Sequence, residues 1–300
     1  MTWEAIPILQ VICIGSSMIG LVSSGFIMSV NCWYRLKGPI LNPCDQLIVA
    51  LAFSSISFSG TNCVYILLLI LGPKTFSAVY TLYFLAFFSS YAIYSGFWLS
   101  GCLCLFFFLK LNNLNHGFLA RIKMKTGTLV PRLILAVQFI SISNALIYTY
   151  RYCDLYLSNF TDSRADRQKF DDTKPDVLII TLQSFNCFIP FLLITVTTIY
   201  IIVSLCKHAH RMHRNLEPGG VINLKAHQRA SCTMTCILVL YIVVFALAMG
   251  FAFPDHFTIL YWVYYIVFCS YAFVQSVILI KGNSKLLQSL KMLFKGKNLH

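Results

Sequence analysis

Charged residues are scarce in this 300-residue chain, and seven long stretches of it contain none at all. Asp, Glu, Lys and Arg make up 11% of the residues and apolar side chains make up 58%, against about 25% and about 45–50% in typical soluble proteins. The seven stretches cover residues 6–32, 46–72, 78–109, 133–150, 177–205, 231–253 and 257–280. A soluble protein with seven buried helices would need a polar face on some of them, so this pattern argues against a soluble fold.

Most of these stretches are long enough to cross a membrane. A hydrocarbon core about 30 Å thick requires about 20 apolar residues in a helix. Lipid offers no partner to backbone polar groups, so each stretch is expected to be helical. We predict an all-α fold with a single membrane domain over residues 1–300, formed by seven transmembrane helices. The end of the chain, residues 281–300, is predicted to be a short basic amphipathic tail that lies on anionic membrane lipid.

The sequence also lacks the signatures of an enzyme or an ion-coupled transporter. It contains no G-x-S-x-G, H-E-x-x-H or G-x-x-x-x-G-K-[ST] motif, and no acid lies within the seven stretches. Transporters usually place ionisable groups at that depth. His208, His210 and His213 lie close together, but three histidines without Cys or carboxylate make a poor metal site. We therefore expect no enzymatic activity, no metal and no cofactor. Because the net charge of +13 is divided between the two sides of a membrane, we expect no nucleic-acid partner.

The distribution of basic residues predicts the orientation. Seventeen of the 23 Lys and Arg residues fall on one side of the predicted membrane, in the 33–45, 110–132 and 206–229 loops and the tail, and eight of the ten acids fall on the other. Cytoplasmic loops carry the excess of Lys and Arg, so the amino terminus is expected outside and the carboxyl terminus in the cytoplasm. The single N-x-[ST] sequon, at Asn159, lies in the 151–176 loop on the outer side, and we predict that Asn159 is glycosylated.

Several segments resemble the taste receptor type 2 family, the bitter taste receptors. The matching segments are F-I-M-S-V-N-C at 26–32, D-Q-L-I-V-A-L-A-F-S at 45–54, W-L-S-G-C-L-C-L-F-F-F-L-K-L at 98–111, S-L-C-K-H-A-H-R-M at 204–212, K-A-H-Q-R-A at 225–230 and I-L-I-K-G-N-S-K-L at 278–286. The resemblance implies a seven-span G-protein-coupled receptor in the plasma membrane, activated by small bitter compounds and coupled to a gustducin-like or Gi-like G protein. A vomeronasal type 1-like receptor is the alternative, and a channel or transporter is a further one.

Two sets of residues follow as candidate sites. The outer half of the third stretch contains Ser89, Ser90, Ile93 and Tyr94, and the resemblance places further ligand residues around the same cavity: Asn186, Tyr241, Val244, Tyr265 and Phe268. With no acid in this set, a cationic agonist would have to rely on aromatic faces. The predicted G-protein-coupling residues ring the cytoplasmic face: Lys110, Arg121, Lys207, His208, Arg211, Lys225, His227 and Arg229.

The chain also departs from the family pattern. Ser24, Ser55 and Gln275 stand where the family usually has Asn, Arg and His. Ser89 and Ile93 stand where a Trp and an Asn are frequent. The first three departures predict a rearranged polar network within the bundle.

Overall fold

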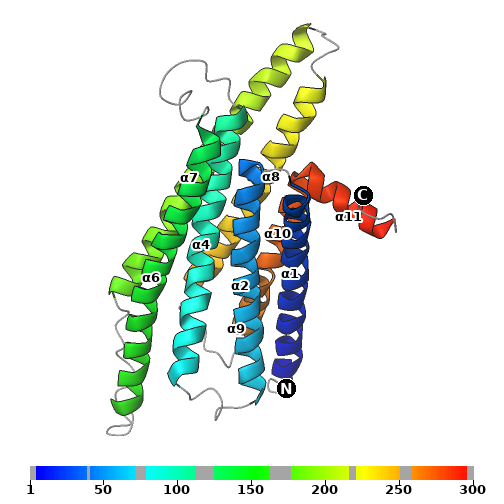
Figure 1. Cartoon of the computed structure of the whole chain (residues 1–300). Helices are drawn as coiled ribbons and strands as arrows, with labels where there is room; N and C mark the ends of the chain where they lie inside the picture. Colours follow the sequence, from blue (N-terminus) through cyan, green and yellow to red (C-terminus); the bar gives the residue numbers. More distant parts are fainter. Residues whose placement is uncertain are drawn as a thin grey trace.

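The structure is a computed structural model that describes residues 5–38, 41–71, 79–111, 125–162, 177–215, 221–250 and 259–295. These residues form a bundle of long helices with a shorter helix across one end (Figure 1). The helices are α1 (Ala5–Leu36), α2 (Pro43–Leu71), α4 (Val79–Leu111), α6 (Thr126–Asp162), α7 (Val177–Asn215), α8 (Val221–Gly250), α9 (Ile259–Cys269), α10 (Tyr271–Gly282) and α11 (Ser284–Phe294).

The described part of the chain contains seven helical spans that are long and apolar enough to cross a membrane. They lie in α1, α2, α4, α6, α7, α8 and the α9–α10 pair, which together cover one span at Tyr261–Gly282. The predicted all-α bundle of seven membrane-spanning helices is therefore confirmed. Its orientation stays a prediction, so the two ends are named here by what they carry: the N-terminal end and the α11 end.

Three helices extend well beyond their apolar stretches. Helix α6 covers Thr126–Asp162 although its predicted span was 133–150, α7 continues to Asn215, and α8 begins at Val221. The apolar run marks only the part of a helix that lipid surrounds, and polar residues can continue the same helix in water. Figure 1 shows α7 and α8 projecting past the other helices at the α11 end.

The seventh span is divided at Ser270 but keeps its backbone hydrogen bonding. The Ser270 amide donates to the Ile266 carbonyl at 3.0 Å, and the Val274 amide donates to the Ser270 carbonyl at 3.0 Å. The Ser270 hydroxyl also donates to the Ile266 carbonyl, at 2.8 Å, a contact that often bends helices. The predicted span 257–280 thus corresponds to two helical segments along one path.

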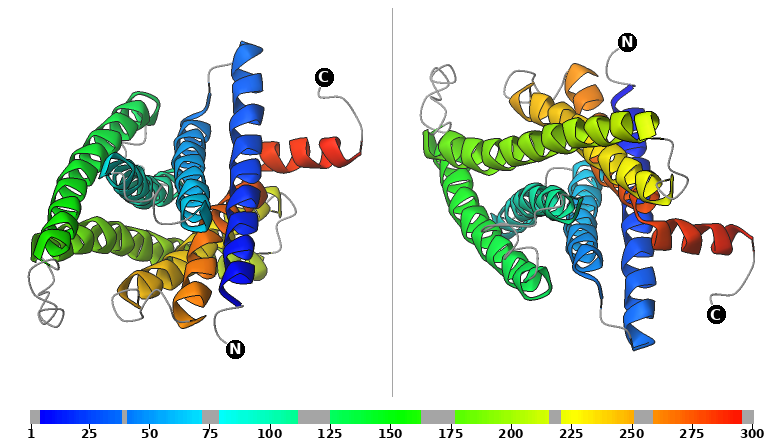
Figure 2. Two further views of the ribbon diagram at one scale, coloured as in Figure 1. Left: turned by 90° about the horizontal axis from the view of Figure 1, so that it is seen from below. Right: turned by 90° about the horizontal axis from the view of Figure 1, so that it is seen from above.

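Helix α4 occupies the middle of the bundle. Of its most apolar window, 72% is buried, against 22% for α6 at the flank. Figure 2 shows α4 between α6 and α2, with α6 at the edge farthest from α1. The outward faces of α6 and α7 carry exposed apolar side chains such as Phe139 and Val196, as expected for a surface that faces lipid.

Two glycines permit very close contacts between spans. A β-carbon on Gly20 of α1 would lie 2.7 Å from the Ser59 hydroxyl of α2, and one on Gly282 of α10 would lie 2.5 Å from the Thr233 hydroxyl of α8. Small residues at such positions let helix backbones approach each other. The contact at Gly282 holds α8 close to α10 at the α11 end.

Candidate functional site

A cavity of about 870 Å³ opens among the helices at the N-terminal end. Its volume is within the range of about 300–1,000 Å³ that is usual for small-molecule sites. Side chains from α1, α2, α4, α6, α7, α8 and α9 line it, and none of the described lining residues carries a charge. The cavity is therefore suited to neutral, largely apolar compounds.

The structure brings most of the predicted ligand residues to this cavity. Seven of the nine line it: Ser89, Ser90, Ile93, Tyr94, Val244, Tyr265 and Phe268. They come from three different helices, so the sequence reasoning identified a set that is close in space. Their role in ligand binding stays a prediction.

Asn186 and Tyr241 lie in contacts between helices and not in the cavity lining. The Asn186 side-chain oxygen accepts hydrogen bonds from Trp98 Nε1 at 3.0 Å and Asn144 Nδ2 at 3.1 Å, so it joins α7 to α4 and α6. The Tyr241 hydroxyl donates to the Gly96 carbonyl at 2.9 Å and its ring packs against Phe97. Both residues are buried. Their contacts are those of residues that fix the positions of neighbouring helices.

The predicted ligand set leaves out two groups of lining residues. One is a set of amides, Gln10, Asn62 and Gln183, and the other is a set of aromatic side chains, Tyr65, Tyr148, Tyr152, Tyr261 and Trp262. Amides are unusual inside apolar stretches, and that signal could have identified the first group. The Tyr265 hydroxyl donates to Asn62 Oδ1 at 3.1 Å, and its ring contacts those of Tyr65 and Tyr261, so this predicted residue touches both groups.

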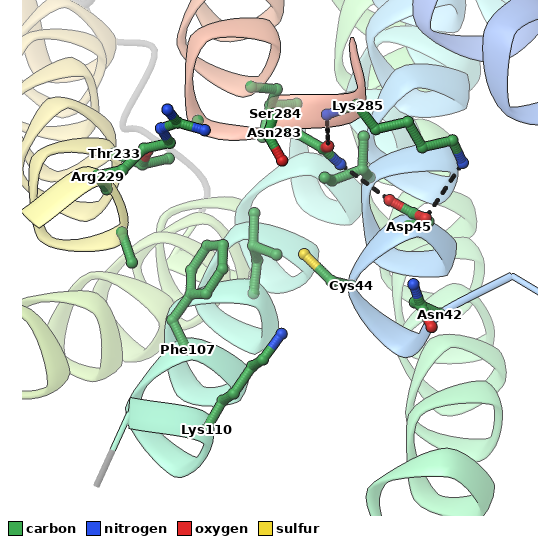
Figure 3. A pocket seen from close by; sticks show the side chains of 15 residues that line it. Asn42, Cys44, Asp45, Phe107, Lys110, Arg229, Thr233, Asn283, Ser284 and Lys285 are labelled. Atoms are coloured by element: carbon green, nitrogen blue, oxygen red, sulfur yellow. Dashed lines mark hydrogen bonds and ion pairs between the residues drawn. The ribbon is translucent and has the colours of Figure 1, made fainter. Parts of the chain in front are cut away.

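A smaller hollow of about 360 Å³ lies at the α11 end (Figure 3). Lys110 of α4 and Arg229 of α8 line it from one side, and Asp45 of α2 and Lys285 of α11 line the other. Asp45 Oδ2 lies 3.2 Å from Lys285 Nζ, and Asp45 Oδ1 accepts a hydrogen bond from Asn283 Nδ2 at 2.8 Å. Because Asp45 is paired with Lys285, the described lining keeps an excess of positive charge.

The side chains of the remaining predicted coupling residues are outside the described structure. Lys207, His208 and Arg211 belong to α7, and Lys225 and His227 belong to α8, at positions whose side chains are outside the described structure. Arg121 is outside the described residues altogether. The glycosylation candidate, Asn159, is within the last turns of α6, and its side chain is also outside the described part. These roles stay predictions.

The three departures in the bundle interior belong to two uncharged sets of hydrogen bonds, which reach α10 at the adjacent residues Gln275 and Ser276. The Ser24 and Ser276 hydroxyls lie 2.9 Å apart, joining α1 to α10. The Ser55 hydroxyl donates to Gln275 Oε1 at 2.9 Å, and Gln275 Nε2 donates to the Ser100 hydroxyl at 3.1 Å. Hydroxyls and one amide therefore connect α2, α10 and α4 here, so no buried charge needs a counter-charge at these positions.

A bundle of seven membrane-length helices, with a neutral cavity at one end and a basic hollow at the other, is the architecture of a seven-span receptor. A family model described as Taste receptor protein (TAS2R) matches residues 1–297. The chain belongs to this family of taste receptors. The predicted family is confirmed, and so is the predicted function as a bitter taste receptor of the G-protein-coupled class. Family membership makes the chain a receptor rather than an enzyme, and the vomeronasal and channel alternatives are not favoured.

Individual relatives match over most of their length. The chain is 25% identical to taste receptor type 2 member 7 of Rattus norvegicus, over 96% of this chain and 95% of the rat protein. It is 27% identical to taste receptor type 2 member 9 of Homo sapiens, over 97% and 95%. It is 29% identical to taste receptor type 2 member 14 of Gorilla gorilla gorilla, over 74% and 70%. These modest identities extend along the chain, as expected for a shared fold with altered sites.

Proposed function

We propose that this receptor lies in the plasma membrane with its amino terminus outside and its carboxyl terminus in the cytoplasm. In this orientation the 870 Å³ cavity faces the exterior and the basic hollow faces the cytoplasm. Small bitter compounds bind in the cavity, and a heterotrimeric G protein of the gustducin-like or Gi-like type is activated at the α11 end. The observation that carries the proposal is the contrast between the two ends of the bundle, one uncharged and open, the other basic.

The cavity supports recognition of neutral compounds with limited polarity. Tyr65, Tyr261 and Tyr265 offer aromatic surface, while Ser89 and the amides of its wall offer isolated hydrogen-bonding groups. The proposed ligand-binding set at the cavity wall also includes Ser90, Ile93 and Tyr94 of α4, Val244 of α8 and Phe268 of α9. Asn186 and Tyr241 contribute by holding α4 in place, through the contacts with Trp98 and Gly96.

The α11 end supports docking of an acidic or carboxylate-terminated helix. Among the described residues, neither Lys110 nor Arg229 has an ion-pair partner, so both are available to an incoming negative charge. Agonist binding shifts a two-state bundle toward the form whose cytoplasmic cleft accepts the carboxyl-terminal helix of Gα. The proposed coupling surface also includes Arg121, Lys207, His208, Arg211, Lys225 and His227.

A calcium-release assay tests the ligand side of this proposal. Cells that carry a taste-type G protein and express the receptor are exposed to a panel of bitter compounds. At least one compound is expected to release calcium, and Tyr265→Ala is expected to lower its potency. Val263→Ala is the matched control, because Val263 is on the same helix and faces outward. The proposal is contradicted if the receptor reaches the cell surface but no compound in the panel triggers calcium release.

The signalling side is tested with Lys110→Ala and Arg229→Ala. Both variants are expected to reduce the calcium response at saturating agonist while surface expression stays at the wild-type level. Lys291→Ala on α11, an exposed basic residue outside the hollow, serves as control. An equal loss of signal and of surface receptor would assign Lys110 and Arg229 to folding instead.

A further inference from the structure

Two buried nitrogen atoms on side chains that line the cavity have no hydrogen-bond acceptor in the described part of the chain. They are Nδ2 of Asn62 on α2 and Nε1 of Trp262 on α9. Each of these side chains belongs to a residue that is only 4% exposed, so bulk solvent does not satisfy them. Both atoms can only donate, and a buried donor without an acceptor destabilises the structure that holds it.

The buried hydroxyls of the same lining differ from these two nitrogens. The Thr61 hydroxyl donates to the Ser57 carbonyl at 2.7 Å, and the Ser90 hydroxyl donates to the Ala86 carbonyl at 2.6 Å. Each of these bonds lies within one helix, so neither hydroxyl requires a partner from elsewhere. Among the described lining residues, no other buried side-chain nitrogen or oxygen lacks a partner.

Tyr265 places the two donors around one region of the lining. Its hydroxyl donates to Asn62 Oδ1 at 3.1 Å, a bond that uses the acceptor end of the amide and leaves the Nδ2 group. Its ring meets the Trp262 ring edge-on, with the centroids 6.0 Å apart. Both donors therefore belong to side chains that contact Tyr265.

The other amides of the lining do not supply the missing acceptors. Gln10 and Gln183 also line the cavity, but each brings an NH2 group as well as an oxygen. If either oxygen accepted from Asn62 or Trp262, its own NH2 group would remain to be satisfied. The described lining contains no carboxylate. An excess of donors is matched best by a ligand that carries acceptors and no donors.

We propose that Asn62 and Trp262 form the polar end of the ligand site and bind an uncharged acceptor, the carbonyl oxygen of a ketone, lactone or ester. The inference rests on the proposed function and names the ligand class for that site. A carbonyl oxygen has two lone pairs and can accept from both nitrogens. Neither nitrogen is exposed, so binding includes a small rotation of the two side chains toward the cavity. A ligand without an acceptor leaves these donors unpaired, and such losses give strong discrimination.

Two matched pairs of compounds test the role of the carbonyl. Flavan is flavanone with the carbonyl replaced by CH2, and xanthene is xanthone with the same replacement. None of the four compounds carries a charge or an O–H or N–H donor. In the calcium assay, the ketone of at least one pair is expected to be about tenfold more potent than its CH2 partner. Asn62→Leu and Trp262→Phe are each expected to lower this potency ratio by at least about threefold.

The controls separate the donors from packing. Changes in packing act on both members of a pair, and partitioning into lipid cancels when the ratio of a variant is compared with that of the wild type. Tyr265→Phe removes the hydrogen bond to Asn62 but keeps its amide, and it is expected to keep the ratio whatever it does to the two potencies. Val263→Ala changes an outward-facing residue, 45% exposed, and is expected to change neither potency. If Asn62→Leu does not reach the cell surface, Asn62→Ala makes the same test.

Three results would overturn the proposal. They are a wild-type receptor for which neither ketone is more potent than its CH2 partner, a ratio that stays at the wild-type value in either donor variant, and an equal fall of the ratio in Tyr265→Phe. The bitter-compound panel keeps these outcomes separate from a failure of the proposed function. If panel compounds activate the receptor while the ratio does not respond, only the carbonyl site is wrong. If no panel compound activates it, the proposed function fails first.

Discussion

Lys285 of α11 and Asp45 of α2 form an ion pair between segments 240 residues apart in the sequence, with Lys285 Nζ 3.2 Å from Asp45 Oδ2. The same ammonium donates to Asn31 Oδ1 at 3.0 Å and lies 4.1 Å from the centre of the Tyr34 ring, both on α1. Asp45 is only 6% exposed, so Lys285 and Asn283 take the place of most of the water around its carboxylate. The basic tail helix is thus attached to the first two spans by a specific polar contact.

Lys285→Met removes this pair while keeping most of the side-chain stem. We expect the free energy of unfolding to fall by about 1–3 kcal/mol, because a charged hydrogen bond is lost and a buried carboxylate keeps only its neutral partner, Asn283. Seven of the twelve free cysteines are buried, so a thiol-reactive dye reports melting of the purified receptor. Lys291→Met on the exposed part of α11 is the control. Equal melting midpoints for the two variants would show that the ion pair contributes nothing.

Gly282→Ala tests the close contact between α10 and α8. The added carbon meets the Thr233 side chain at 2.5 Å from its hydroxyl and 2.8 Å from its methyl group, and overpacking of this kind costs about 1–3 kcal/mol. We expect a lower melting midpoint and partial recovery in the double variant with Thr233→Ala. Gly60→Ala in α2 is the matched control, since nothing lies within 4 Å of its added carbon. Absence of any rescue by Thr233→Ala would place the strain elsewhere.

Gln275→Leu tests the uncharged network. The substitution leaves the buried Ser55 hydroxyl without its partner, at an expected cost of about 1–3 kcal/mol, while the Ser100 hydroxyl keeps its hydrogen bond to the Gly96 carbonyl. Val274→Ala, on the neighbouring half-exposed position, is expected to shift stability by no more than about 0.5 kcal/mol. The measurement compares the thermal melting temperatures of the two variants with that of the wild type. The network has no stabilising role if Gln275→Leu melts at the wild-type temperature.

The uncharged cavity predicts a penalty for charged agonists. Hydrocinnamic acid carries a carboxylate at neutral pH, and its methyl ester has nearly the same shape without the charge. We expect the acid to be at least about tenfold weaker than the ester in the calcium assay, because an ionised group loses water on entry and meets no described counter-charge. A more potent acid, or a nanomolar agonist that depends on one ammonium group, would contradict this.

Apolar run length was sufficient to predict the seven-span bundle, since lipid allows few alternatives for an uncharged stretch of about 20 residues. It could not predict that α6 reaches Asp162 or that α7 reaches Asn215, because helix continuation in water depends on local propensity and not on hydropathy. The division at Ser270 was also beyond the pattern. A serine within an apolar run looks the same whether or not its hydroxyl bonds to the preceding turn.

The candidate ligand site was predictable where a helix face and a family pattern agreed. Ser89, Ser90, Ile93 and Tyr94 lie on one side of α4, and the structure places all four at the cavity. Tyr148 and Tyr152 of α6 were missed because a tyrosine on an apolar helix gives the same sequence pattern whether it faces lipid or the bundle interior. Tyr148 and Tyr150 illustrate this: only Tyr148 lines the cavity, and Tyr150 is 63% exposed. Three-dimensional packing decides between them.

The Asn283 side chain makes hydrogen bonds to two different elements. Its oxygen accepts from the Lys285 backbone amide at the start of α11, and its nitrogen donates to the Asp45 carboxylate of α2. The direction of the tail helix is therefore tied to the positions of α2 and α10. The tip of α11 also exposes Leu293 and Phe294, side chains suited to the acyl boundary of a membrane. Coupling free energies are reciprocal, so headgroups or bilayer thicknesses that favour one tilt of α11 also favour one arrangement of the spans. We therefore expect the dose–response curve of this receptor to depend on its bilayer as well as on the protein.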